Sequence, residues 1–156
     1  MFETPDLPSP DPANLVKLEP VFDFRQHLNG PMISEGVIFG PTGRVVSKFV
    51  ADMEGRWNGN SGELHESFRF ASGETDHRVW EISLLKGGSY TARAHDIVGT
   101  GLGQMHAMSA CSRYRIRLGP QAHNLVVSAV DWMYLSETGV ILNRSKFRKF
   151  GVKVAE

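Results

Sequence analysis

The sequence predicts an all-β protein whose strands follow one another around an antiparallel up-and-down barrel, with a flexible, proline-rich N-terminal arm. Turn signals built from Gly, Pro, Asn and Ser recur from residue 32 onward, and the segments between them alternate polar residues with β-branched and aromatic ones. Such alternation between regularly spaced turns is typical of antiparallel strands. Seven of the eight prolines lie at or before position 41. This is expected if the rest of the chain is a strand ladder, because proline removes a ladder hydrogen bond.

Eight segments are expected to form strands joined by short turns. Because no long crossover connection separates them, they favour a closed up-and-down barrel, and a two-sheet sandwich is the alternative. The expected strands cover residues 32–40, 43–57, 63–71, 75–85, 89–97, 103–118, 123–135 and 139–155.

The N-terminal region differs in composition from the predicted barrel. Residues 1–14 contain four prolines and three acidic residues, which favours an extended, polyproline-like arm. Residues 15–28 carry scattered apolar side chains that could form a short helix or a strap over the core. We therefore divide the chain into an arm or strap over residues 1–21 and a β-barrel domain over residues 22–156.

Composition excludes several classes of partner. The chain has 156 residues, in which 17 basic and 17 acidic side chains cancel, whereas a nucleic-acid binder needs a clustered cationic face. No apolar run approaches the roughly 18 residues of a membrane helix. The N-terminus has neither the basic start nor the apolar stretch of a secretory signal. We expect no nucleic-acid partner, no membrane insertion, and a cytoplasmic protein or a mature form whose signal was removed.

Three charged residues fall on the inward phase of their strands, namely Glu66, Arg78 and Asp96. A charge buried alone is costly, so these groups should be paired. Arg78 can bind a carboxylate with two parallel hydrogen bonds, and the second carboxylate should then have a raised pKa. The trio is interpreted either as a polar cluster at the bottom of a cavity, where it orients a ligand, or as a structural ion pair near a solvent-exposed rim.

The interior could hold one small ligand. Several inward-facing residues are alanines, and an eight-stranded barrel has room for a small molecule when its interior side chains are small. The alternative is that the large aromatic residues fill this space. The candidate ligand site combines the charged trio with three aromatic residues, Phe68, Trp80 and Tyr114.

Other motifs point to no cofactor or metal. None of the six histidines stands in a His-Glu-x-x-His or paired i, i+2 pattern, so they are interpreted as solvated surface residues and no metal site is expected. The glycine run 99–103 resembles a phosphate loop, but no helix is expected after it and its glycine spacing does not match the dinucleotide fingerprint. We interpret the run as a turn or bulge.

The single cysteine, Cys111, excludes an internal disulfide framework and a cysteine-based zinc site. It lies on an outward phase near Arg113 and Arg115, which could lower the pKa of its thiol, but no histidine partner is apparent.

The strand around Trp132 is apolar on both faces, so its phase cannot be assigned. Its outer face could form the surface of a homodimer.

Several sequence blocks spread over most of the chain resemble a known family. The blocks include His27-Leu-Asn-Gly-Pro31, Gly55-Arg-Trp-Asn-Gly59, Leu64-His-Glu66, Arg78-Val-Trp80, Ala94-His-Asp-Ile-Val-Gly99, Asp131-Trp-Met-Tyr134 and Lys149-Phe-Gly151. Together they resemble the bacterial DUF3833 family, a domain of unknown function that is similar to lipocalins and other calycin barrels. The resemblance implies an antiparallel barrel, no established activity and no accepted functional residues. Many members resemble lipoproteins, but this sequence shows neither the signal nor the lipidated cysteine, so the resemblance does not imply membrane anchoring.

Three functional hypotheses follow. The first is a lipocalin-like carrier or sensor that binds a small, partly apolar ligand inside the barrel. The second is a cofactor-free lyase or isomerase in which Glu66 or Asp96 acts as general acid and base and Arg78 binds a carboxylate. The third is an interaction module that uses a barrel face or the arm and has no ligand site.

Overall fold

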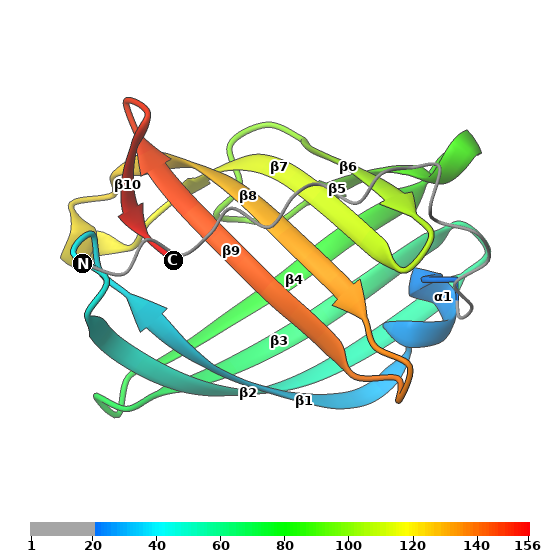
Figure 1. Cartoon of the computed structure of the whole chain (residues 1–156), viewed down its shortest axis with the longest axis horizontal. Helices are drawn as coiled ribbons and strands as arrows, with labels where there is room; N and C mark the ends of the chain where they lie inside the picture. The colour runs from blue at the N-terminus through cyan, green and yellow to red at the C-terminus, as the bar shows by residue number, and fades with distance from the viewer. Residues whose placement is uncertain (1–20) are drawn as a thin grey trace.

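The computed structural model describes residues 21–156, so all but the last residue of the expected arm lies outside the described part. Ten strands form one antiparallel sheet in which each strand pairs with the next along the chain (Figure 1). The prediction of an all-β up-and-down barrel is therefore confirmed. The strands are β1 (Gly30–Phe39), β2 (Val45–Asn58), β3 (Ser61–Phe70), β4 (Thr75–Leu84), β5 (Ser89–Arg93), β6 (Gly101–His106), β7 (Ser109–Arg117), β8 (Val126–Leu135), β9 (Ile141–Lys149) and β10 (Val152–Ala155).

The prediction of eight strands is wrong because two of the expected strands are hairpins. The segment 103–118 turns at Ala107, whose φ of 49° is uncommon for a residue with a side chain, and so divides into β6 and β7. The segment 139–155 turns at Phe150 and Gly151, where φ is 48° and 78°, and divides into β9 and β10. The first turn contains no Gly, Pro, Asn or Asp, and sequence patterns therefore do not mark it.

The barrel is nearly closed, and its first and last strands meet at one end. The backbone N–H of Phe39 donates to the Glu156 carbonyl at 2.7 Å, and the N–H of Glu156 donates to the Phe39 carbonyl at 3.0 Å. Within residues 21–156, no other backbone hydrogen bond joins β1 to β9 or β10. β10 and α1 (Phe24–His27) lie at opposite ends of the barrel (Figure 1).

The helix α1 closes one end of the barrel. The side chain of Asp23 caps its first turn by accepting a hydrogen bond from the Arg25 N–H. At its other end, the Leu28 carbonyl accepts a hydrogen bond from Trp57 Nε1 at 2.9 Å. A Cβ atom at Gly55 would lie 1.8 Å from the same carbonyl oxygen, so a glycine in β2 permits this close approach.

The apolar core lies mainly at the α1 end. The buried side chains there come from the helix and the residues beside it and from five strands, and they exclude water from that end of the barrel. The cluster consists of Phe22, Phe24, Leu28, Leu64, Ile82, Tyr90, Ala92, Ala110 and Leu135. A second, smaller cluster lines the β7–β8 wall and consists of Ile97, Tyr114, Ile116, Val127 and Ala129.

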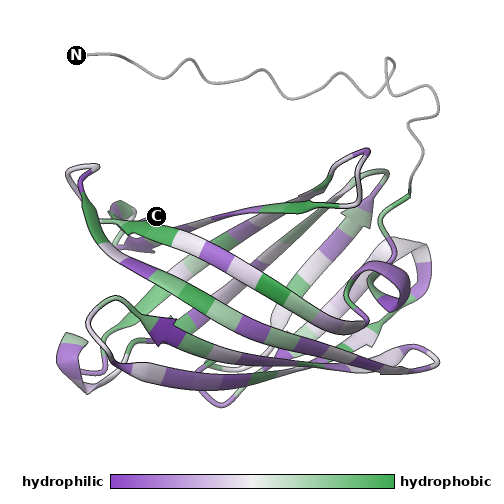
Figure 2. Ribbon diagram, turned by 90° about the horizontal axis from the view of Figure 1, so that it is seen from below, coloured by the Kyte–Doolittle hydropathy of each residue, from purple (hydrophilic) through white to green (hydrophobic). Residues whose placement is uncertain are grey.

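Polar and apolar residues alternate along the strands (Figure 2). In β2, Ala51 is completely buried whereas Asp52 is exposed, as the sequence pattern predicts. In β8, whose phase the sequence could not assign, Ala129 and Leu135 are buried. Trp132 therefore points outward and is 38% exposed. The dimer surface expected around it stays a prediction.

Candidate functional site

Contacts inside the barrel join the six residues of the predicted ligand site. Glu66 on β3 and Arg78 on β4 are directly opposite each other in the strand register, so their side chains share the inward face. Asp96 follows β5, and its carbonyl accepts a hydrogen bond from the Arg117 N–H of β7 at 2.8 Å. Adjoining them on β3, β4 and β7 are the aromatic residues Phe68, Trp80 and Tyr114.

Arg78 is bound chiefly by Asp96. Its Nε and Nη2 donate to Asp96 Oδ2 at 2.9 and 2.7 Å, whereas Nη1 lies 3.5 Å from Glu66 Oε2. The guanidinium carbon also lies 5.8 Å from the centre of the Phe68 ring and 5.5 Å from that of Trp80. The fork that could hold a ligand carboxylate is thus occupied by Asp96.

Glu66 is the most deeply buried of the three predicted charges, with 9% of the residue exposed. Its Oε2 accepts a hydrogen bond from Trp80 Nε1 at 3.2 Å, while Oε1 accepts none from any described residue. Burial raises the pKa of Glu66 to about 7, and the opposing effects of Arg78 and Trp80 do not cancel it. The expected raised pKa of one carboxyl is therefore found at Glu66, which exchanges its proton near neutral pH.

A fourth charged residue, Asp131 on β8, belongs to the same interior. Its Oδ2 accepts a hydrogen bond from the Tyr114 hydroxyl at 2.7 Å. Its Oδ1 is buried and has no hydrogen-bond partner among the described residues. The hydroxyl of Ser145, opposite Asp131 in the register, donates to Asn143 Oδ1 at 3.1 Å. Burial raises the pKa of Asp131, and the nearby hydroxyls of Ser145 and Tyr114 oppose the rise.

Sequence reasoning missed Asp131 because β8 is apolar on both faces. The register settles its phase, since it pairs the inward Tyr114 of β7 with Ala129, two residues before Asp131. Two residues apart on a strand means the same face. A strand-pairing argument from β7 to β8 is the signal that could have placed Asp131 inside.

Two glycines of the run 99–103 permit a turn and a close packing contact. Gly99 has a φ of 76° and turns the chain before β6. A Cβ atom at Gly103 would lie 2.0 Å from the Tyr90 ring, so this glycine leaves room for the aromatic side chain that crosses it. The Tyr90 hydroxyl lies 2.5 Å from Ser112 Oγ, and burial raises the pKa of Tyr90 to about 12.

Three phenylalanines gather beyond the polar cluster, on the side away from α1. The centre of the Phe49 ring lies 5.5 Å from that of Phe68 and 6.3 Å from that of Phe70. All three are half-buried. The Phe49 ring crosses Gly36 of β1, where a Cβ atom would lie 2.5 Å from it. The three rings thus form a half-buried aromatic group, one member of which, Phe68, borders Arg78.

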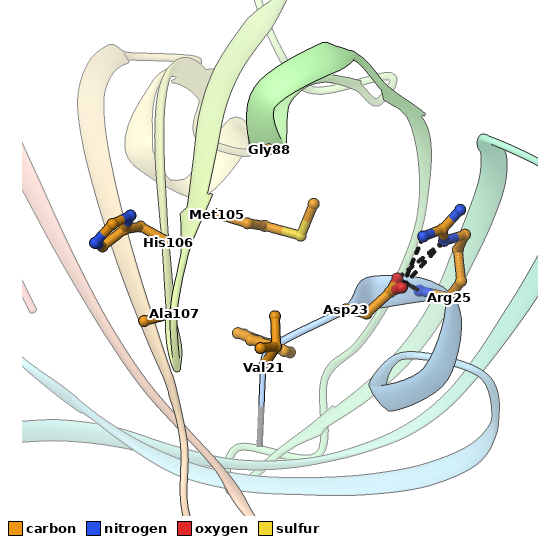
Figure 3. A pocket seen from close by; sticks show the side chains of 8 residues that line it. Val21, Asp23, Arg25, Gly88, Met105, His106 and Ala107 are labelled. Atoms are coloured by element: carbon orange, nitrogen blue, oxygen red, sulfur yellow. Dashed lines mark hydrogen bonds and ion pairs between the residues drawn. The ribbon is translucent and has the colours of Figure 1, made fainter. Parts of the chain in front are cut away.

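Two of the hollows in the described part of the chain lie elsewhere. The first, of about 210 Å³, lies between α1 and the β6–β7 turn, and Val21, Arg25 and Met105 are among its lining residues (Figure 3). The second, of about 480 Å³, is lined by parts of β2, β3 and β4, including Trp57 and Glu81. Neither hollow is lined by any of the six predicted site residues. The predicted site is therefore an interior cluster, separate from these hollows.

The pKa of the Cys111 thiol is shifted in the direction opposite to the one that the neighbouring arginines suggest. The thiol is half-buried, and burial raises its pKa, although Arg113 opposes the rise. The expectation of a lowered thiol pKa is therefore wrong, because loss of solvent outweighs attraction to the guanidinium. A protonated thiol is a poor nucleophile.

The model of one protein family, described as a protein of unknown function (DUF3833), matches residues 6–156. The chain belongs to the DUF3833 family. No curated protein and no solved structure matched the sequence. Among residues 21–156 of this DUF3833 protein, no helix has the length and apolar character to span a bilayer.

The blocks that carry the DUF3833 resemblance meet in space. Leu28 of one block contacts Gly55 and Trp57 of another, where α1 closes the barrel. Four further blocks contribute the charged groups of the interior, which are Glu66, Arg78, Asp96 and Asp131. The resemblance therefore coincides with two structural features of the DUF3833 protein: the closed end and the polar interior.

Proposed function

We propose that the protein binds a small, partly apolar molecule inside the barrel. The polar end of the ligand lies against Glu66, Arg78 and Asp96, and its apolar part lies against Phe68, Trp80 and Tyr114. The observation that carries this proposal is the free oxygen of Glu66. Glu66 Oε1 accepts no hydrogen bond from a described residue and is not among the fully buried side-chain atoms that lack a partner, so it is open to a donor that a ligand brings.

The distribution of the core supports the same conclusion. Apolar side chains fill the α1 end and cover the β7–β8 wall, but the phenylalanines of β2 and β3 remain half-buried. The side chains of Arg78 and Asp96 also keep 18% and 14% of their surface exposed. Partly exposed aromatic rings around a few polar groups are typical of ligand sites.

A binding titration tests the proposal. The full chain is titrated with N-phenyl-1-naphthylamine, a neutral probe whose fluorescence rises in apolar surroundings, and the purified protein is examined by native mass spectrometry. Phe68→Ala should weaken probe binding about tenfold, because one aromatic contact of the ligand is lost. Phe150→Ala is the matched control, since that ring is 93% exposed. A protein that binds no probe and carries no ligand would refute the proposal and favour an interaction module without a ligand site.

A cofactor-free lyase or isomerase is the second candidate, and one observation favours it. The pKa of Glu66 is about 7, which suits a general acid and base at neutral pH. A molecule recovered by native mass spectrometry would be incubated with the protein in deuterated water. Exchange of a carbon-bound hydrogen that Glu66→Gln abolishes would support catalysis, and no exchange would leave binding alone.

A further inference from the structure

The charges inside the barrel do not balance. Glu66, Asp96 and Asp131 contribute three carboxyl groups, and Arg78 contributes the one guanidinium among them. Asp96 accepts hydrogen bonds from both Nε and Nη2 of that guanidinium. Within the described residues, Asp131 forms no ion pair and Glu66 reaches Arg78 only at 3.5 Å. Arg78 therefore neutralises Glu66 and Asp131 less than it neutralises Asp96.

The two oxygen atoms of this cluster that lack a hydrogen-bond partner are both acceptors. Glu66 Oε1 and Asp131 Oδ1 both lack a partner among the described residues. An ionised carboxylate only accepts hydrogen bonds, so a group that pairs with either atom must be a donor. Asp131 Oδ1 is fully buried whereas Glu66 Oε1 is not, and the Glu66 side chain keeps 12% of its surface exposed. Glu66 Oε1 is therefore the oxygen that an incoming group can reach.

The aromatic rings around the cluster favour a positively charged ligand. Trp80 and Tyr114 pack edge to face with their centres 5.3 Å apart, and Phe68 and Trp80 already border the Arg78 guanidinium. The faces of aromatic rings attract cations. A carboxylate ligand would instead add a fourth acidic group to a desolvated site, where like charges repel strongly.

We propose that the ligand is an amphiphilic amine whose ammonium group donates a hydrogen bond to Glu66 Oε1. Its hydrocarbon part extends toward Phe49, Phe68 and Phe70. This inference rests on the proposed function and names the chemical class of the ligand.

The proposal has a definite pH dependence. The titratable and charged groups that face Glu66 are Arg78 on β4, Asp96 after β5, Tyr114 on β7 and Asp131 on β8. An ammonium ion binds the ionised form of Glu66. Binding below neutral pH must therefore displace a proton, and affinity rises as the pH rises through about 7. It falls again only when the amine itself loses its proton, near pH 10.

Three ligands of equal chain length distinguish the classes. Octylamine, octanoate and 1-octanol are compared in their ability to displace N-phenyl-1-naphthylamine from the full chain at pH 8 and at pH 5.5. Octylamine should displace the probe at a concentration about tenfold lower than octanoate at pH 8, and its advantage should shrink at pH 5.5. Glu66→Gln should abolish the advantage. Glu63→Gln should leave it unchanged, since Glu63 is an exposed residue of the same strand that pairs with His65.

The outcomes separate the two proposals. If the probe binds but octanoate or octanol displaces it as well as octylamine does, the amine inference is wrong and the binding function stands. The inference also fails if Glu63→Gln and Glu66→Gln weaken octylamine equally, because attraction would then be a property of the surface. If the probe itself does not bind, the proposed function fails first.

Discussion

The hydroxyl of Tyr114 on β7 donates a hydrogen bond to Asp131 Oδ2 on the neighbouring strand β8, with the two oxygens 2.7 Å apart. The other oxygen of this carboxyl group, Asp131 Oδ1, has no hydrogen-bond partner among the described residues. Burial raises the pKa of the Tyr114 hydroxyl, and Asp131 raises it further. The pair links the wall of the barrel to the charged interior.

Tyr114→Phe should lower the free energy of unfolding by about 1–3 kcal/mol at pH 8. The substitution removes the donor and leaves a buried carboxylate without it, which costs more than the hydrogen bond itself contributes. Urea denaturation followed by tryptophan fluorescence measures the change. Tyr134→Phe is the control, because Tyr134 is 47% exposed on the same sheet. Equal effects of the two variants would show that the hydrogen bond from Tyr114 to Asp131 does not contribute to the free energy of unfolding.

Gly55→Ala should destabilise the closed end of the barrel. The added methyl group would lie 1.8 Å from the Leu28 carbonyl oxygen, so α1 must move and the hydrogen bond from Trp57 must lengthen. A cost of about 1–3 kcal/mol or more is expected for such overpacking. Urea denaturation measures it, and hydrogen exchange at the Leu28 amide should accelerate.

Gly119→Ala is the matched control for that substitution. Its φ is −65°, and a Cβ atom there would meet nothing within 4 Å. Its stability should therefore stay within about 0.5 kcal/mol of the parent, as is usual for surface changes. If the two alanine variants proved equally stable, the close approach at Leu28 would not constrain the fold.

The interior could be predicted from the sequence where one face of a strand is plainly polar. Period-two alternation placed Glu66 and Arg78 on the inward face, and the register puts them opposite each other. Counting two carboxyls against one guanidinium also predicted a raised pKa, which occurs at Glu66. These predictions succeed because alternation and charge balance are local properties of the chain.

The parts that could not be predicted depend on tertiary context. The turn at Ala107 needs a positive φ at a residue that rarely adopts one, so nothing in the local sequence divides β6 from β7. Asp131 sits in a strand that is apolar on both faces, and only pairing with β7 gives its direction. Whether Arg78 would choose Asp96 or Glu66 depends on side-chain geometry that alternation does not specify.

Arg78→Met should be among the most destabilising substitutions in the barrel. It leaves Asp96 and Glu66 buried without their shared cation, and breaking a buried pair from one side costs about 3–5 kcal/mol. The double variant Arg78→Met with Asp96→Asn should recover much of the loss, because the uncompensated charge is removed as well. Urea denaturation of the two single variants and the double variant gives the coupling energy. Additive losses would show that the ion pair found between Arg78 and Asp96 does not contribute as a unit.

Glu66→Gln should stabilise the protein at pH 8 and flatten the dependence of stability on pH between 4.5 and 7. The pKa of Glu66 rises from the usual 4.5 to about 7 on folding, so between these values the folded state binds more protons than the unfolded state. Stability contributed by the neutral carboxyl is therefore complete below pH 4.5 and lost as the pH rises through 7. The shift corresponds to on the order of 3 kcal/mol, and Asp131, whose pKa is also raised, acts in the same direction. Urea denaturation from pH 4.5 to 8 measures the slope, with Glu63→Gln as the control. A slope that Glu66→Gln leaves unchanged would mean that other groups, and not this buried carboxyl, govern the response to pH.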